Sequence, residues 1–386
     1  MKRNDLSRCL VAFGQNSTLV AVVELSLKSW LVAGLVPGLA RKPLKKLGAD
    51  EDALLALLHR WRGEAIKAGS KIDRVVVAFE AGRDGFWLAR WLRARDIEVY
   101  VIHPSSVPVS REHRRAKSDR LDTELLMRAV LGWLRGEAKH CSMVAIPTLA
   151  QEDARRPNRE HEHLSGERTS IVNRMKAAMA RHGIRSFKLK LSKASEQIEK
   201  LRTPEGGALP ANTLAELQRD LTRLRLVRDQ MRQIEQQRLQ RLSQAPQEGS
   251  HPMVLLLAKV LGIGIETADM LVHEVLSRNL RDERAVGRYA GITGSPDESG
   301  SKRREKGLAR AGNARVRRGM VQLAWRWIMF QKESALAKWF HARTAAAPRD
   351  VRKTMIVALA RKLLIALWRY VTTGEVPAGA KLRPAI

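Results

Sequence analysis

Residues 74–122 constrain the possible fold of this chain more than any other stretch. An apolar run over residues 74–79 ends at Glu80, an amphipathic segment follows over residues 84–95, and a second apolar run occupies residues 97–102. This pattern predicts a strand, a helix and a second strand. Such a unit belongs to the α/β class, in which polar groups at the strand ends meet at one edge of the sheet.

Three carboxylates accompany this unit. Glu80 stands at the carboxyl end of the first strand, and Asp119 and Asp122 are three residues apart, so a helix would present them on one face. Carboxylates that converge among Arg and Lys residues suit divalent metal ions acting on a phosphodiester. The alternative is structural: Glu80 would be a solvated strand end, and the two aspartates would form a reciprocal helix cap.

The residues before and after this unit complete a six-element pattern. A buried strand over residues 18–24 supplies Glu24, which is either a strand-end charge or a further acid of the cluster, with equal weight for each. The whole pattern predicts a ribonuclease-H-like domain that ends near residue 150. Its other expected elements are a hairpin strand at 29–36, helices at 50–68 and 119–134, and a last strand at 143–147.

Charge and composition restrict the possible partners. The chain has 70 Lys and Arg against 40 Asp and Glu, a net charge of +30, which favours binding to a long polyanion over a small acidic substrate. Cys9 and Cys141 are far apart and lack zinc-type spacing, so we expect a reduced compartment without a disulfide framework. We also expect a cytoplasmic protein without membrane contact, because no leader pattern and no apolar run of about 18 residues occurs.

Residues 151–250 have few strand formers and many Arg and Gln residues. We expect a short helix at 171–182, a Gly- and Pro-rich break at 203–213 and a linker at 245–252. Apolar residues at steps of three and four from Leu214 to Ile234 predict a coiled-coil-like seam. The partner of this seam is either a helix of the same chain, in an antiparallel hairpin, or a second subunit, which we favour slightly.

Residues 251–386 combine helices with a basic, glycine-rich segment. Residues 257–275 resemble a helix-hairpin-helix, whose glycines would let backbone N–H groups approach a phosphate, although an ordinary turn fits equally well. Residues 299–318 hold eight Lys or Arg residues, and this segment predicts a loop that binds the sugar-phosphate backbone of a nucleic acid. Trp325, Trp327, Trp339 and Trp368 are expected in the core. The candidate nucleic-acid contacts are Arg111, Arg114, Arg115, Lys117, Gly262, Gly264, Lys302, Arg303, Arg304, Lys306, Arg310, Asn313, Arg315, Arg317 and Arg318.

Three blocks of the sequence resemble a known family. They are VVVAFEAGRDGFWLARWL, REHRRAKSDRLD, and YAGITGSPDESG followed by RAGNARVRRGMVQLAW. The chain is similar in these blocks to the DEDD transposases of bacterial insertion sequences called the one-ten family, recombinases guided by a bridge RNA. The resemblance implies a RuvC-like nuclease domain at 1–150, a helical coiled-coil insertion at 151–250 and a mainly helical transposase domain at 251–386.

The resemblance also implies a set of catalytic residues. Glu80, Asp119 and Asp122 match three of the family's four acids, and Glu24 stands where the family usually has Asp. The family's catalytic serine falls on Ser299, beside Gly300, with Ser295 and Ser301 as rival positions. The implied cofactor is Mg²⁺, with Mn²⁺ as a substitute. The implied partners are double-stranded DNA of the element ends and the target, a guide RNA, and further copies of the chain in a dimer or tetramer.

The leading interpretation is therefore a recombinase that moves its own element through a covalent serine–DNA intermediate. A serine hydroxyl needs a base or a metal ion to become a nucleophile, and no neighbouring His is apparent for Ser299. The sequence leaves two alternatives open. One is a metal-dependent nuclease or Holliday-junction resolvase that forms no covalent intermediate. The other is an inactive nucleic-acid-binding remnant.

Overall fold

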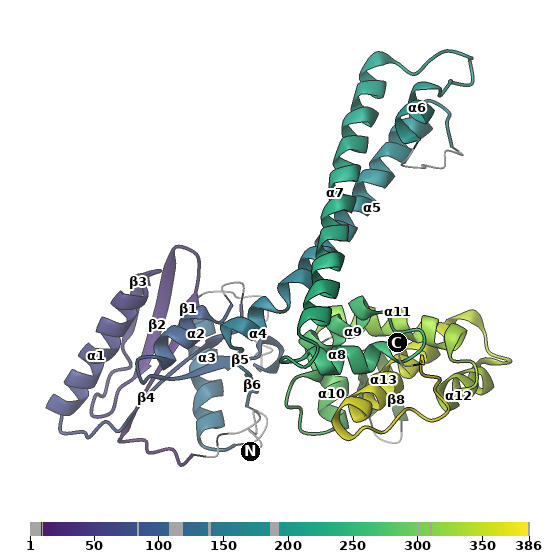
Figure 1. Cartoon of the computed structure of the whole chain (residues 1–386). Coiled ribbons are helices and arrows are strands. Elements are labelled where there is room, and N and C mark those ends of the chain that lie inside the picture. Colours follow the sequence, from purple (N-terminus) through teal and green to yellow (C-terminus); the bar gives the residue numbers. More distant parts are fainter. Residues whose placement is uncertain are drawn as a thin grey trace. The chain divides into compact units, whose positions relative to one another are not determined.

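The computed structural model describes residue 9 and residues 11–82, 85–107, 119–137, 140–185, 193–299, 302–308 and 311–384. The chain forms two compact units, Met1–Ala150 and Gln151–Ile386. The first unit contains the main sheet, and the second is mostly helical (Figure 1). An α/β unit followed by a helical region is the predicted fold class, which is confirmed.

The first unit is built on a six-stranded sheet in the order β3-β2-β1-β4-β5-β6. Strands β1, β4 and β5 are parallel neighbours, and the remaining pairings are antiparallel. Residues 44–48 include exposed lysines and form an edge strand that pairs with residues 29–33. The strands are β1 Thr18–Leu25, β2 Ser29–Leu35, β3 Leu44–Gly48, β4 Arg74–Glu80, β5 Glu98–Ile102 and β6 Met143–Val144.

Helices cover both faces of this sheet. α1 (Glu51–Lys67) and α2 (Trp87–Arg93) pack on one face, around Trp61 and Phe79. α3 (Asp119–Leu134) packs on the other face, against alternate residues of β1 and β4. Strands β1, β2, β4 and β5 therefore contribute to two separate cores, because their side chains alternate between the two faces of the sheet.

A long helical hairpin opens the second unit. α5 (Arg156–Arg181) and α7 (Ala211–Gln244) pack against each other along much of their length, as Figure 1 shows. The slightly favoured interpretation of the α7 seam as a contact between subunits was wrong, because α5 of the same chain buries it. The buried seam residues of α7 are Leu217, Leu221, Leu224, Val227, Met231 and Ile234.

The rest of the second unit shares one apolar core. Trp327 is buried in it and Trp339 and Trp368 pack against it, whereas Trp325 is exposed, contrary to the prediction. Residues 302–308 were expected in a loop but form a strand that pairs with 294–299. The elements are α8 His251–Ala258, α9 Ile265–Leu271, a π-helical turn Val272–Leu276, α10 Glu283–Tyr289, β7 Gly294–Ser299, β8 Lys302–Leu308, α11 Ala314–Phe330, α12 Ala335–Thr344 and α13 Arg349–Thr373. Two short helices, α4 Leu149–Asp153 and α6 Ala194–Glu199, complete the described chain.

Within the described residues, no helix is both long enough and apolar enough to cross a membrane.

Candidate active site

Two acids end neighbouring parallel strands. In the β1–β4 ladder Val23 is opposite Phe79, so the next residues, Glu24 and Glu80, lie side by side at the carboxyl edge of the sheet. The parallel arrangement is possible because α1 provides the crossover between the two strands. The structure thus brings together the two strand-borne acids that were predicted from the sequence.

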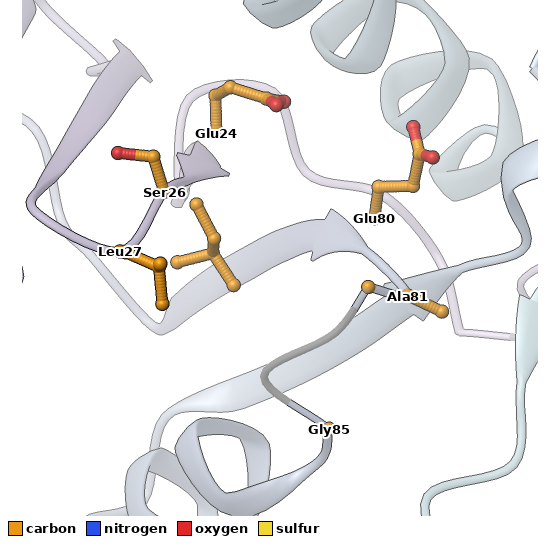
Figure 2. Close-up of a pocket in the computed structure, with 8 residues that line it drawn as sticks. Glu24, Ser26, Leu27, Glu80, Ala81 and Gly85 are labelled. Carbon is orange, nitrogen blue, oxygen red and sulfur yellow. The ribbon is translucent and has the colours of Figure 1, made fainter. Parts of the chain in front are cut away.

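Side-chain alternation directs both acids to the face covered by α3. Val22 and Ala78 belong to the core beneath α3, whereas Val23 and Phe79 belong to the core beneath α1 and α2. Because side chains on a strand alternate between faces, Glu24 and Glu80 point to the same side as Val22 and Ala78. Figure 2 shows both carboxylates on one side of the two strands.

The direction of α3 places its first turn at the same edge. The last turn of α3 lies near the amino-terminal ends of the strands, because residues close together in the sequence bond to both: Cys9 N donates to Trp133 O of α3 (3.1 Å), and Arg74 at the start of β4 donates to Ala12 O (3.0 Å). The 16 residues of α3 span about 24 Å and the eight of β1 about 26 Å, so the helix is about as long as the strand. The start of α3, with Asp119 and Asp122, therefore lies near the edge that carries Glu24 and Glu80.

A small hollow lies between the two strand ends. It has a volume of about 150 Å³, and its lining residues are Glu24, Leu25, Ser26, Leu27, Glu80, Ala81, Gly82 and Gly85. Asp122 is half-buried on α3 and is not among these residues, and the side chain of Asp119 lies outside the described part of the chain. Carboxylate oxygens are the donors that Mg²⁺ and similar hard cations prefer, so the residues at this edge fit a divalent ion.

Sequence reasoning missed Ser26 and Leu27, which line the hollow together with Glu24. Both lie in the short turn between β1 and β2, directly after the acid. A turn that follows a strand-end acid was a usable signal, because such a turn necessarily borders whatever that acid binds.

A second acidic group lies in the helical unit, where none was predicted. His161 on α5 has Nε2 at 3.0 Å from Glu235 of α7 and Nδ1 at 3.1 Å from Glu266 of α9. The three residues could bind a metal ion, but one ion can reach only one of the two ring nitrogens. An imidazolium that donates both N–H groups accounts for the geometry. The hydrogen bond with Glu266 raises the pKa of His161 although burial opposes it.

A buried polar network adjoins this histidine. Asp269 accepts hydrogen bonds from Asn158 Nδ2 (2.8 Å) and Arg238 Nε (3.2 Å), and its other oxygen is 3.2 Å from His273 Nε2. Nearby, Glu274 accepts from Arg159 Nε at 3.0 Å. The network ties the base of the α5–α7 hairpin to α9 and the π-helical turn.

Ser299, the predicted nucleophile, is the last residue of β7, paired with Lys302 at the start of β8. Its position is therefore the tip of a β-hairpin. Ser295 stands near the other end of β7. The side chains of both serines, and Gly300 and Ser301 entirely, lie outside the described residues.

The predicted nucleic-acid contacts fall into several groups. Arg111, Arg114, Arg115, Lys117 and Arg310 lie outside the described residues. Four basic residues of β8 are placed by their backbone alone: Lys302, Arg303, Arg304 and Lys306. Arg317 is half-buried on α11.

Three of the predicted contacts bond within the protein. Asn313 caps α11 and donates to Glu274 through Nδ2 (2.9 Å). Arg315 donates to Glu162 of α5 (2.5 Å), and Arg318 bonds the other oxygen of Glu162. Arg315 and Arg318 therefore hold α11 to α5 of the hairpin, and Asn313 holds it to the π-helical turn.

The two predicted phosphate-contacting glycines lie in the turn between α8 and α9. Gly262 has a φ of +91°, and a Cβ there would lie 3.1 Å from Phe330, so its glycine is required by the fold. Gly264 is the N-cap residue of α9, with open space around it. A helix, a glycine turn and a second helix are thus present as predicted, and phosphate binding there stays a prediction.

Comparison with known proteins identifies similarity over most of the chain. A family model described as "Transposase IS116/IS110/IS902 family" matches residues 254–358, which include Ser299. A DEDD transposase model of the IS110 type matches residues 41–184, which include Glu80, Asp119 and Asp122 but not Glu24. A protein of Sinorhizobium fredii (strain NBRC 101917 / NGR234), named "Putative transposase y4rJ", is 39% identical over 371 residues, 94% of this chain and 93% of that protein. The chain belongs to the IS116/IS110/IS902 family of transposases, enzymes that bind and process DNA and whose DEDD acids imply a divalent metal ion.

Proposed function

We propose that this transposase cleaves and rejoins DNA strands with four acids and one serine. Glu24, Glu80, Asp119 and Asp122 are the proposed metal ligands, and Ser299 is the proposed nucleophile. The observation that carries the proposal is the placement of Glu24 and Glu80 side by side on the face covered by α3. That arrangement supports a metal role for Glu24, although its side chain is one methylene longer than the usual Asp.

The proposed reaction conserves phosphodiester bonds. The Ser299 oxygen attacks the scissile phosphorus, a serine–phosphate ester forms, and the deoxyribose oxygen of the broken bond leaves with a proton that balances the one lost by serine. In the joining step the hydroxyl of a second strand attacks the same phosphorus and restores the serine hydroxyl. Because each step exchanges one ester for another, no energy-rich co-reactant is required. A bound Mg²⁺ would supply Lewis-acid polarisation of the phosphate.

The partners follow from the same proposal. The net charge of +30 supports binding of the double-stranded DNA at the element ends and the target. A structured guide RNA and assembly into a dimer or tetramer are further parts of the proposal. Ribonuclease treatment of the purified protein should abolish site-specific recombination while non-specific DNA binding persists. Site-specific recombination that persists after ribonuclease treatment would exclude a role for a guide RNA.

The central test uses a plasmid that carries the protein's own insertion element with its flanks. With Mg²⁺, denaturing electrophoresis should show DNA covalently attached to the wild-type protein. Glu80→Gln and Ser299→Ala should both lose the adduct, and the control variant Ser295→Ala should retain it. Cleavage by Ser299→Ala without an adduct would instead indicate a plain nuclease. Salt-sensitive binding without cleavage by the wild-type protein would indicate an inactive remnant.

A further inference from the structure

A second hollow adjoins the acidic one. It has a volume of about 170 Å³ and shares four lining residues with the first hollow, so the two lie next to each other. Its remaining walls differ in character, because they are largely aromatic and aliphatic. The shared residues are Leu25, Ser26, Leu27 and Gly85, and the others are Trp30, Ala49, Glu51, Trp87 and Leu88.

Trp87, one of the two tryptophans that line this hollow, is not part of the hydrophobic core. Trp87 is the first residue of α2 and 38% exposed, while Leu88, Ala89 and Leu92 supply the buried face of the helix. Its ring lies 6.3 Å from that of the buried Trp30, at an interplanar angle of 42°. Leu27, which lines both hollows, is 67% exposed. Two large apolar side chains are thus partly or largely exposed to water around the second hollow.

We propose that this hollow receives an unstacked nucleobase from the nucleotide next to the scissile phosphate. The inference rests on the proposed function, because the acidic hollow must hold that phosphate. A phosphate bound there has its neighbouring base within one nucleotide, and the adjoining second hollow offers that base an aromatic surface. Tryptophan stacks any base, and such a contact contributes about 1–3 kcal/mol per base.

Glu51 gives the hollow a preference among bases. It lines the second hollow but not the first, so it lies on the part farther from the metal ligands. A carboxylate only accepts hydrogen bonds, and the exocyclic amino groups of cytosine, adenine and guanine donate them. Thymine offers a single N–H between two carbonyl oxygens, which a carboxylate repels. The hollow should therefore favour any of the three bases with an amino group, cytosine included, over thymine.

The first experiment is a double-mutant cycle in which one change is made in the protein and the other in the DNA. Trp87→Ala is combined with an abasic nucleotide beside the mapped cleavage site, and cleavage rates are measured with Mg²⁺. Each change alone should slow cleavage about 5- to 150-fold, the equivalent of one stacking contact. Together they should slow it no further, because both remove the same contact. Multiplied losses, or an unaffected Trp87→Ala, would overturn the proposal.

Matched variants separate stacking from folding. Trp87→Phe keeps an aromatic surface and should recover most of the rate. Trp91 lies one turn further along α2, and the Arg95 guanidinium covers its ring at 3.6 Å. In Trp91→Ala the abasic nucleotide should therefore slow cleavage as much as it does in the wild type.

The base preference has its own test. In the wild type, DNA with cytosine at this position should be cleaved faster than DNA with thymine, and Glu51→Gln should reduce that difference. The α1 cap survives this variant because Asp50, not Glu51, accepts from Asp52 N and Ala53 N. Equal rates for the two bases in the wild type would remove Glu51 from the proposal.

A binding experiment distinguishes this proposal from the proposed function. Glu80→Gln, with Ca²⁺, is irradiated with element-end DNA that carries 5-iodocytosine beside the cleavage site. Crosslinking to Trp87, located by mass spectrometry, would support the base site without requiring activity. Crosslinking to another residue, together with normal cleavage by Trp87→Ala, would contradict the base site and leave the proposed metal site unaffected. Full cleavage by Glu80→Gln would sink the metal site and leave the crosslink as an independent result.

Discussion

Removal of Asp269 should destabilise the base of the helical hairpin more than any surface substitution. Asp269 and Arg238 are 7% and 3% exposed, and they bond at 3.2 Å with Asn158 as a shared partner. Burial alone would raise the pKa of Asp269, but the hydrogen bond from His273 and the charge of Arg238 hold it below its ordinary value. The carboxylate is therefore charged at neutral pH and neutralises a buried guanidinium.

Asp269→Ala leaves the Arg238 guanidinium buried without its counter-charge. Breaking a buried pair in this way costs about 3–5 kcal/mol. For a unit of this size each kcal/mol lowers the melting temperature by about 2–4 °C, so we expect a decrease of about 6–20 °C. Circular dichroism at the helical wavelength measures the change, because most helices belong to this unit.

Two variants test the reasoning behind that magnitude. Asp229→Ala removes an exposed pair with Arg232 on the same hairpin and should shift the melting temperature by no more than about 4 °C. The double variant Asp269→Leu with Arg238→Met removes both buried charges and should recover most of the loss. An Asp269→Ala protein that melts within about 2 °C of the wild type would refute the assignment of a buried, energetically coupled pair.

Three other predictions concern separate sites. The pKa of His161 is raised in the folded protein, so the ion pairs of His161 stabilise the fold fully below the unfolded-state pKa of about 6.5. This stabilisation is lost as the pH rises through the folded-state pKa. The difference in unfolding free energy between the wild type and His161→Gln, measured by urea titration, should therefore shrink above about pH 6.5. Gly34→Ala would place a Cβ 2.7 Å from the Trp61 ring and should cost about 1–3 kcal/mol in the same assay, whereas Gly63→Ala, with open space, should not. Ca²⁺ should support DNA binding but little cleavage by the wild type, and full cleavage in chelator would contradict the metal role.

The elements with clear periodicity could be predicted from the sequence. The run over 74–79 and the strand over 18–24 alternate between two cores, so their apolar residues are nearly continuous. The amino-terminal half of α5 was missed for a physical reason. Its buried face continues from Leu164 and Ile171 back to Asn158 and His161, polar residues whose partners are Asp269, Glu235 and Glu266. A hydropathy pattern assigns such residues to solvent.

The role of the basic motif near residue 315 was also beyond local sequence patterns. Arg315 and Arg318 look like free cations for a phosphate, but Glu162, more than 150 residues earlier in the chain, bonds both. Charge density in a sequence does not show which cations the fold has already paired. The basic residues of β8 were expected in a loop, but they lie on a strand. A strand also suits a row of phosphate contacts, because every second side chain lies on the same face.

Glu24 illustrates how one long-range observation supports a catalytic proposal. Its identity and its place at a strand end left two interpretations open, and the family match over 41–184 does not include it. The β1–β4 register supports the proposed metal role of Glu24, because Val23 opposite Phe79 puts Glu24 beside Glu80 on the face of α3. A shift of one residue along β1 would turn Glu24 towards α1 and α2, away from Asp122. The case for Glu24 as the fourth acid therefore depends on the apolar residues Val20, Val22 and Val23, which fix that register by filling two cores.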